Sequence, residues 1–207
     1  MARKPAELTV QRPDILLAAA RVFYERGYHG AKMEDIARAV DLTAGSLYHH
    51  FPQGKQEILL AVLVAGLEEI TTQIEAIAVQ ALAPAEKFRA AVTMHILGVT
   101  ENVAIGAAMV FEIRTLLDIP EVREAYIARR DAFERLFRQI LQEGVAQGVF
   151  VINDIKLAVR MVLGAQNWVG VWYRAGGPLT GVEIAAQMAE WFLYAFQYPA
   201  RMAPQAG

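Results

Sequence analysis

The sequence contains no cysteine among its 207 residues. This absence excludes disulfides, thiolate nucleophiles and cysteine-ligated zinc or iron–sulfur centres, and it fits a reducing compartment such as the cytoplasm. The longest uncharged, apolar-rich run, 161–173, is shorter than the roughly 18 residues that a membrane-spanning helix needs. No apolar stretch of the kind found in secretory signals follows Arg3 and Lys4. We therefore expect a soluble, cytoplasmic protein with no membrane partner.

Signals for paired strands are also missing, because nearly every segment has apolar residues at helical spacing. Pro13 suits a first helical turn, and Gly27 suits the residue just past a helix end. The pattern predicts an all-α chain of about nine helices, with a small three-helix N-terminal unit joined to a larger helical body. The predicted helices span 13–26, 33–40, 44–51, 55–80, 85–99, 103–117, 121–147, 154–174 and 181–197.

The net charge of −2 shows no strong excess of either sign, but its distribution is uneven. Residues 1–60 carry eight Lys/Arg and seven Asp/Glu, and three of the four histidines also lie there. The rest of the chain carries twelve basic and fifteen acidic residues. This mild asymmetry is compatible with nucleic-acid binding at the N-terminal end, but it does not by itself predict such binding.

Residues 33–51 have the spacing of a helix-turn-helix, in which the second helix offers its outer face to a DNA major groove. The positions that must pack inward are all apolar: Ile36, Ala37, Val40, Leu42 and Leu47. Thr43 is a good N-cap for the second helix. The outward positions are Ala44, Gly45, Ser46, Tyr48, His49 and His50. Small residues allow close approach to the DNA backbone, and Tyr and His can reach phosphates or thymine methyl groups.

The pair His49-His50 also suggests a metal site. Adjacent residues on a helix point about 100° apart and do not readily chelate one ion, and the sequence places no further ligand, carboxylate or nucleophile beside them. We expect no metal, no cofactor and no catalytic residue here. A plain surface helix is the remaining alternative to DNA contact.

Residues 15–63, ILLAAARVFYERGYHGAKMEDIARAVDLTAGSLYHHFPQGKQEILLAVL, resemble the DNA-binding domain of the tetracycline-repressor-like (TetR) transcriptional regulators. The resemblance implies a DNA-binding domain over 11–71 and a ligand-binding and dimerisation domain over 72–200. It also implies a homodimer on a pseudo-palindromic operator, released when a small effector binds. The implied DNA contacts are Arg3, Lys4, Lys32, Thr43, Ala44, Gly45, Ser46, Tyr48, His49, His50 and Lys55.

Lys32 departs from the family pattern, which places Thr or Ser as the cap of the second helix. We expect Glu34 or Asp35 to take over at this end, because negative charge is favourable at a helix N-terminus. Lys32 would then point at the phosphate backbone. Lys55 should also reach a phosphate, although the turn after Phe51 is one residue longer than the commonest form.

Residues 164–182, GAQNWVGVWYRAGGPLTGV, resemble a TetR subgroup that responds to acyl-coenzyme A (acyl-CoA) thioesters. Trp168 and Trp172 share a helix face and are candidate ligand contacts together with Gln166. The alternative for both tryptophans is the core or a dimer interface. An aromatic or cationic drug is the alternative effector class.

Further candidate ligand residues are polar or adaptable side chains inside apolar stretches: His95, Met109, Glu112 and Arg114. An Arg in such surroundings needs an anionic partner, which a phosphorylated ligand or a neighbouring helix can supply. His95 is either a hydrogen-bonded core residue or a ligand contact. The methionine is either core filler or the flexible wall of a cavity.

The last two helices offer an apolar surface that two copies could pair into a four-helix bundle. The expected interface residues are Val162, Val169, Tyr173, Met188, Trp191, Phe192 and Ala195. A small helical enzyme is the rival class, but the sequence shows no metal set, nucleophile–base pair or phosphate loop. A DNA-binding architectural protein without a ligand is a second rival, which a solidly packed body would favour.

Overall fold

The computed structural model describes residues 10–111 and 120–202, and within these ranges the chain forms nine helices and no strand. The prediction of an all-α chain is therefore confirmed. The helices are α1 (Arg12–Gly30), α2 (Met33–Ala39), α3 (Ala44–His50), α4 (Lys55–Ala78), α5 (Pro84–Glu101), α6 (Val103–Phe111), α8 (Pro120–Ala146), α9 (Ile155–Trp172) and α10 (Gly181–Met202).

The helix ends agree with the sequence pattern to within a few residues. Gly27 has φ 67° and interrupts α1 where the sequence predicts its end, and three more residues then continue the helix. Gly54, with φ 70°, closes the turn before α4. Both conformations are left-handed and favour glycine because it lacks a Cβ. The predicted continuation of α6 over 112–117 lies outside the described residues.

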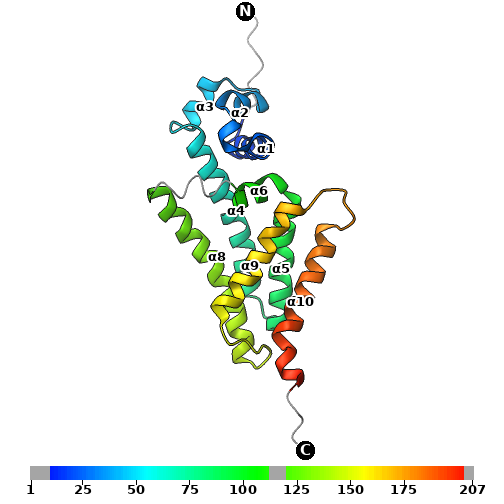
Figure 1. Cartoon of the computed structure of the whole chain (residues 1–207). Coiled ribbons are helices and arrows are strands. Elements are labelled where there is room, and N and C mark those ends of the chain that lie inside the picture. Colours follow the sequence, from blue (N-terminus) through cyan, green and yellow to red (C-terminus); the bar gives the residue numbers. More distant parts are fainter. Residues whose placement is uncertain (1–9, 112–119, 203–207) are drawn as a thin grey trace, which may run out of the picture.

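Helices α1, α2 and α3 form a small unit at one end of the molecule, and α4 runs from this unit into the larger body (Figure 1). One apolar core runs through both parts. Buried residues of α4 such as Ile58 and Leu59 lie near its start, while Ile70 and Ile74 lie in the body. Helix α4 thus joins the two parts without a loop between them.

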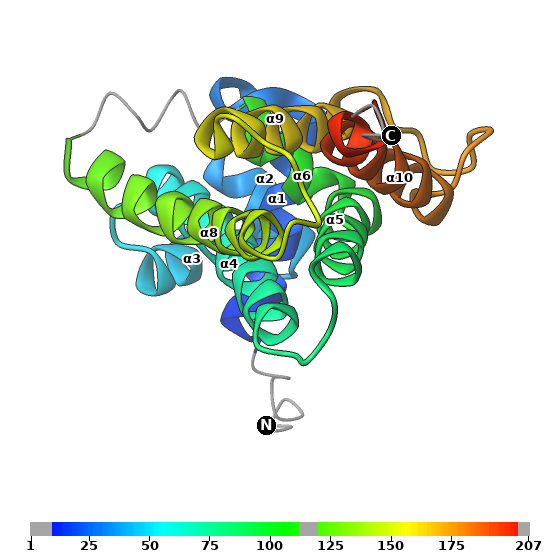
Figure 2. The same ribbon diagram turned by 90° about the horizontal axis from the view of Figure 1, so that it is seen from below.

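The body is a bundle in which α8 lies beside α4 and α10 lies beside α5 (Figure 2). Helix α9 packs on α5, α6 and α8. Helix α6 occupies the junction, because it packs against α1 on one side and against α4, α5 and α9 on the other. Within the described residues, α4 and α6 therefore provide the main contacts between the small unit and the body.

Candidate nucleic-acid interface and effector cavity

Helix α3 presents one anchored face and one exposed face. Thr43 caps it, because its Oγ1 accepts a hydrogen bond from the Ser46 backbone N–H at 3.0 Å. Leu47 is fully buried, as predicted, and Phe51 at the end of the helix is fully buried as well. Tyr48 is 47% exposed on the opposite side, and exposed His49 and His50 accompany it. The structure thus places these three side chains where a ligand as large as DNA can reach them, while contact with DNA itself stays a prediction.

The turn between α2 and α3 fixes how these helices cross. Asp41 has φ 55°, a left-handed conformation that Asp tolerates better than most residues. The Leu42 backbone N–H donates to the Ala37 carbonyl at 2.9 Å, which closes the turn. Half-buried Val40 and Leu42 pack against the core. This local chemistry positions α3 across α2 in the manner of a helix-turn-helix.

Asp35 caps the start of α2 in place of the missing Thr or Ser. Its Oδ2 accepts from the Lys32 backbone N–H at 3.2 Å, which confirms one of the two predicted replacements. The same carboxylate accepts from Arg26 and Arg38 at 3.2 and 3.3 Å. The Lys32 side chain is exposed, so its ammonium group lies at the surface beside the helix start.

A cleft of about 380 Å³ lies between the start of α2, Tyr48 and the turn that precedes α4. Lys32 and Lys55 both line it. The cleft combines a phenol hydroxyl, two ammonium groups and two helix starts, which are groups that bind phosphate oxygens. Glu34 also lines the cleft, so one carboxylate lies beside these donors.

Lys55 differs from the expectation in its contacts. Its Nζ donates to the carbonyl oxygens of Tyr28 and Ala31 at 2.5 and 2.8 Å, and it lies 4.4 Å from the centroid of the Tyr28 ring. The ammonium group therefore ties α4 to the end of α1. A phosphate contact from Lys55 stays a prediction. It requires the ammonium group to share its N–H donors between the phosphate and these carbonyl oxygens, or to release the carbonyl oxygens.

Several predicted site residues fall outside the part of the chain that can be described. Arg3, Lys4, Glu112 and Arg114 lie outside the described residues, so the structure does not place them. Met109 belongs to α6, but its side chain is likewise outside the description.

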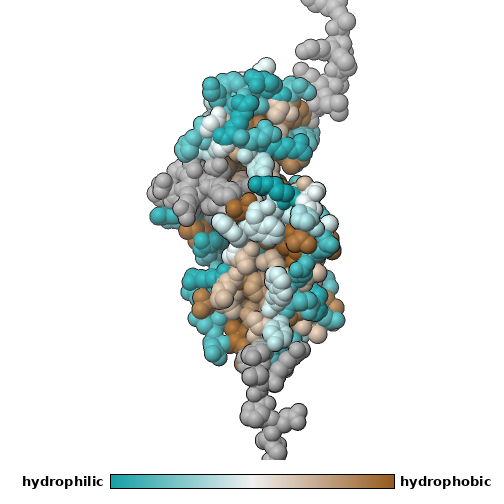
Figure 3. Space-filling view, turned by 45° about the vertical axis from the view of Figure 1, so that its right-hand side comes forward, coloured by the Kyte–Doolittle hydropathy of each residue, from teal (hydrophilic) through white to brown (hydrophobic). Residues whose placement is uncertain are grey.

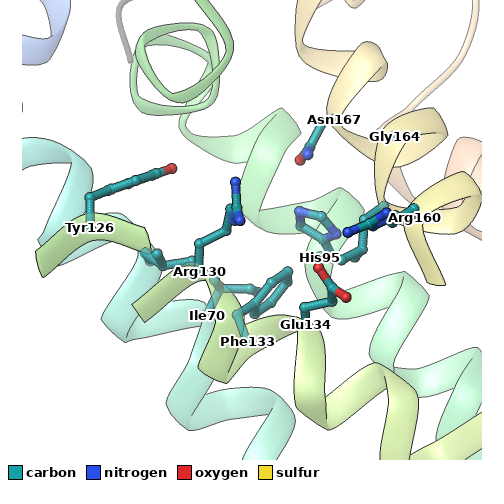
Figure 4. Close-up of a pocket in the computed structure, with 11 residues that line it drawn as sticks. Ile70, His95, Tyr126, Arg130, Phe133, Glu134, Arg160, Gly164 and Asn167 are labelled. Carbon is teal, nitrogen blue, oxygen red and sulfur yellow. The ribbon is translucent and has the colours of Figure 1, made fainter. Parts of the chain in front are cut away.

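A first cavity of about 520 Å³ opens between α4, α5, α8 and α9 (Figure 4). Most of its wall is apolar, and polar side chains from α5, α8 and α9 enter it. Its lining residues are Leu67, Ile70, His95, Tyr126, Arg130, Phe133, Glu134, Arg160, Leu163, Gly164 and Asn167. A mostly apolar cavity with a few convergent polar groups is the usual form of a small-molecule site.

A second cavity of about 320 Å³ lies between α4, α5 and α6. It shares Ile70, His95 and Asn167 with the first cavity, so the two spaces meet at these three residues. Its apolar wall includes Met94, Leu97 and Ile105, while its charged residues are Glu69 and Glu101. The body therefore contains two adjoining cavities that open to the surface, which argues against the architectural protein without a ligand.

His95 occupies the junction of the two cavities. Its Nδ1 lies 3.0 Å from the Oε1 of Gln166, which is fully buried. The ring packs edge-on against Phe133 with centroids 5.1 Å apart. Burial lowers the pKa of His95 to about 4, although hydrogen bonding to Gln166 and Asn167 opposes this shift. His95 is therefore neutral near pH 7, and it is both a hydrogen-bonded core residue and a cavity residue.

Charge enters the first cavity from α8 and α9. Arg130 and Arg160 both line it; Arg130 is paired with neighbouring Asp131, and Glu134 is paired with Arg138 on the next turn of α8. Burial raises the pKa of Tyr126, against an opposing effect of Arg130, so its hydroxyl stays protonated. The first cavity thus has two guanidinium groups and a phenol donor, which favours an anionic or acceptor-rich ligand part.

The sequence prediction missed Tyr126, Arg130, Arg160 and Asn167 as cavity residues. One signal was available, since Arg160 is the single charged residue between Ile155 and Tyr173 apart from Lys156 near the helix start. A lone charge on an otherwise apolar helix points to a partner or a ligand. Arg130 belongs to a run of alternating charges, and from the sequence alone we favour a solvated face for such a run over a site for the coenzyme A phosphates.

Trp168 and Trp172, predicted as ligand contacts, are not among the residues that line either cavity. They are 59% and 46% exposed on the outer face of α9. Val162 and Val169, predicted as interface residues, are instead buried inside the chain. The valines and the tryptophans thus lie on different faces of α9, with the valines toward the core and the tryptophans exposed.

The other predicted interface residues divide by exposure. Trp191 is 67% exposed, and Ala195 is exposed as well. Tyr173, Met188 and Phe192 are half-buried and pack against the core. Figure 3 shows brown and tan side chains gathered on the lower part of the body, toward the end of α10.

Two kinds of site are missing from the described ranges. Within residues 10–111 and 120–202, no group of three or more His, Asp or Glu side chains is arranged to hold a metal ion. Among the same residues, no helix is long and apolar enough to cross a membrane.

Comparison with known proteins identifies the family. Residues 15–62 match the model for bacterial regulatory proteins of the tetR family, and residues 81–196 match the tetracyclin repressor-like C-terminal domain. The transcriptional repressor KstR2 of Mycolicibacterium smegmatis is 30% identical over 186 residues, which cover 88% of this chain and 89% of that protein. The chain therefore belongs to the TetR family of transcriptional regulators, and it is a DNA-binding regulator rather than an enzyme.

Solved structures agree with this assignment. The TetR family regulator PfmR from Thermus thermophilus has a TM-score of 0.80 at 36% identity, covering 86% of this chain and 96% of that one. AibR, solved in complex with isovaleryl coenzyme A and operator DNA, has a TM-score of 0.76 at 27% identity, covering 89% and 97%. Both likenesses extend over the small unit and the body together.

Proposed function

We propose that the protein is a cytoplasmic, homodimeric repressor that an acyl-CoA thioester releases from a pseudo-palindromic operator. The observation that carries this proposal is the pair of adjoining cavities in the body, which α4 lines before it continues to the unit that holds α3. The KstR2 proteins, which are relatives of this chain, are transcriptional repressors. AibR was solved in complex with a coenzyme A thioester and operator DNA. The two functional units, 11–71 and 72–200, share helix α4.

The cavities support a thioester through their two chemistries. Apolar side chains such as Leu67, Phe133 and Ile105 suit an acyl chain. Arg130 and Arg160 suit the phosphates of coenzyme A, because guanidinium groups bind phosphate oxygens with charge-assisted hydrogen bonds. We keep Met109, Glu112 and Arg114 as further proposed contacts, while Gln166 acts through His95.

The alternative effector is an aromatic or cationic drug, and one observation favours it. Glu69 and Glu101 line the second cavity, and carboxylates attract a cation. Glu69, Glu101, Arg130 and Arg160 are all exposed, so solvent screens the charges of both cavities. We favour the anionic thioester because AibR, a similar structure, was solved with a coenzyme A thioester.

A dimer is supported by the outer face of α9 and α10. Large apolar side chains are exposed there at helical spacing, and such a surface is costly unless another protein covers it. They are Leu157, Met161, Trp168, Trp172, Val182, Trp191 and Tyr194. A two-fold pair built on this face would hold two copies of α3 for half-sites about 34 Å apart. We therefore propose Trp168 and Trp172 for the interface, together with Trp191 and Ala195.

The signal from effector to DNA has two routes. Helix α4 lines both cavities through Ile70, and its other end carries Lys55 at the cleft beside Tyr48. Helix α6 lines the second cavity through Ile105 and packs against α1. A ligand that fits only one arrangement of these helices shifts the population of dimers toward that arrangement. DNA affinity falls when the two copies of α3 leave operator spacing.

A gel-shift assay on the region upstream of the protein's own coding sequence tests the DNA-binding half. We expect a specific complex for the unaltered protein, and Tyr48→Ala should weaken it at least about tenfold through the loss of a phosphate or base contact. Tyr24→Ala is a matched control, because Tyr24 is 49% exposed but lies on α1. Circular dichroism should show folded protein for both variants. Equal weakening by the two substitutions would remove Tyr48 from the interface.

A further inference from the structure

The junction of the two cavities is built around one imidazole ring. His95 belongs to α5, and it meets both cavities together with Ile70 of α4 and Asn167 of α9. Any ligand that extends from one cavity into the other must pass these three side chains. Two of the three are polar, so the junction can discriminate between ligands by hydrogen bonding as well as by shape.

The orientation of Gln166 decides which nitrogen of His95 carries the proton. The Gln166 amide Nε2 donates to the backbone carbonyl of Val162 at 3.3 Å, so its Oε1 is the atom that faces His95. An amide oxygen only accepts hydrogen bonds. His95 Nδ1, 3.0 Å away, must therefore be the donor. Burial lowers the pKa of His95 to about 4, so the ring is neutral near pH 7 and its Nε2 has a lone pair.

The other polar groups of the first cavity are mostly donors. Arg130 and Arg160 have no acceptor atoms, and protonated Tyr126 offers a hydroxyl. Glu134 is the one carboxylate in the lining, and it is paired with Arg138. At the junction, the acceptors are consequently His95 Nε2 and the side-chain oxygen of Asn167. Because Asn167 also hydrogen-bonds His95, a ligand donor that reaches Nε2 competes with this amide. Figure 4 shows His95 between Asn167 and the Glu134–Arg160 side of the cavity.

We propose that His95 Nε2 accepts a hydrogen bond from a hydroxyl or an amide N–H of the effector, so that the junction selects ligands with a donor at this point. Gln166 is a positioning residue that holds the required tautomer. The inference rests on the proposed function in taking thioesters as the effector class. Two parts of such a ligand supply this chemistry: a hydroxyl on the acyl chain, or an amide of the pantetheine arm.

Calorimetric titration with decanoyl-CoA and 3-hydroxydecanoyl-CoA distinguishes the two sources. The informative variant is His95→Phe/Gln166→Leu, which removes the acceptor without leaving a buried polar partner unpaired. Thr100→Val is the control, because it removes another buried polar group from α5 that lines neither cavity. All proteins should bind operator DNA equally, which establishes that they are folded.

If the acyl hydroxyl is the donor, the unaltered protein and Thr100→Val prefer the hydroxylated thioester by about tenfold, the effect of one ordinary hydrogen bond. The double variant then binds both thioesters alike. If the pantetheine amide is the donor, the two thioesters bind alike, and the double variant weakens both by about tenfold. Affinities that stay within about threefold for both ligands in the double variant overturn the proposal.

Failure of the effector class has a separate signature. If neither thioester binds the unaltered protein, the acyl-CoA proposal is wrong, and the same titration is done with 3-hydroxydecanoate and decanoate. A hydroxyl preference that disappears in His95→Phe/Gln166→Leu still supports the role of His95. Equal binding of the two acids, or a preference that survives in the double variant, contradicts it.

Discussion

At the scale of single residues, His95 shows how surroundings decide the chemistry of a side chain. Burial keeps the ring neutral, the Gln166 amide fixes its tautomer, and the residue lines both cavities. The same histidine on the protein surface would be a partly charged donor near neutral pH. The hydrogen-bonding character of the junction therefore depends on Gln166 and Val162 as much as on His95.

The lowered pKa of His95 predicts a pH dependence of stability. Between its ordinary pKa of 6.5 and the folded-state value of about 4, the unfolded chain binds a proton that the folded chain does not bind. The titration of His95 therefore leaves the free energy of unfolding unchanged above pH 6.5. It lowers this free energy by on the order of 3 kcal/mol as the pH falls to 4. Urea denaturation at several pH values measures this loss.

The control for that experiment is His95→Phe/Gln166→Leu, which has no titrating ring at this position. Its free energy of unfolding should fall less over the same pH interval, because only the other groups contribute. Identical slopes for the variant and the unaltered protein would show that His95 titrates normally in the folded state.

Residues with local roles could be predicted from the sequence, and those with long-range roles could not. Thr43 and Asp35 act on backbone N–H groups three residues away, so their roles follow from spacing alone. Arg130 and Asn167 come from α8 and α9 and meet only in the folded body. Lys55 finds carbonyl groups more than twenty residues away, and nothing in its neighbourhood in sequence indicates them.

At the scale of elements, α9 has three distinct faces. Val162 and Val169 face the core, Leu163 and Asn167 line the first cavity, and Trp168 lies on the outer face. Periodicity predicts that such a helix is amphipathic, but both of its apolar faces fit the same period. The sequence therefore could not decide which face meets the core. We expected Val162 and Val169 at an interface, and they are buried within the chain.

Helix α8 depends on a glycine for its packing against the following loop. A Cβ added at Gly144 would lie 2.0 Å from the ring of Phe150, which is buried. Gly144→Ala should therefore destabilise the protein by about 1–3 kcal/mol, because the core is overpacked. Gly164→Ala is the matched control, since a Cβ there meets no atom within 4 Å, and it should be neutral or slightly stabilising. Thermal unfolding of both variants checks this, and equal melting temperatures would contradict it.

At the scale of the whole molecule, the account depends on a dimer. Trp168→Glu places a charge in the centre of the proposed interface and should convert the protein to a monomer at micromolar concentration, because an unpaired buried charge is costly. Operator affinity should fall with it, since two recognition helices are needed. Val79→Glu is the control, because Val79 is 83% exposed at the end of α4.

Light scattering coupled to size exclusion reports the masses of these proteins. A dimer for Val79→Glu and a monomer for Trp168→Glu agree with the proposed interface. A monomeric unaltered protein, or a Trp168→Glu protein that remains dimeric, would show that the exposed face of α9 has another role.

The central claim is that occupation of the body lowers affinity for DNA, and fluorescence anisotropy of a labelled operator measures this directly. The operator is the shortest upstream fragment that the protein shifts, and a panel of acyl-CoA thioesters is titrated into the preformed complex. We expect at least one thioester to release the DNA and to weaken the operator complex by at least about tenfold, within the usual range of allosteric coupling. An operator complex whose affinity stays the same at saturating concentrations of every thioester would contradict the account.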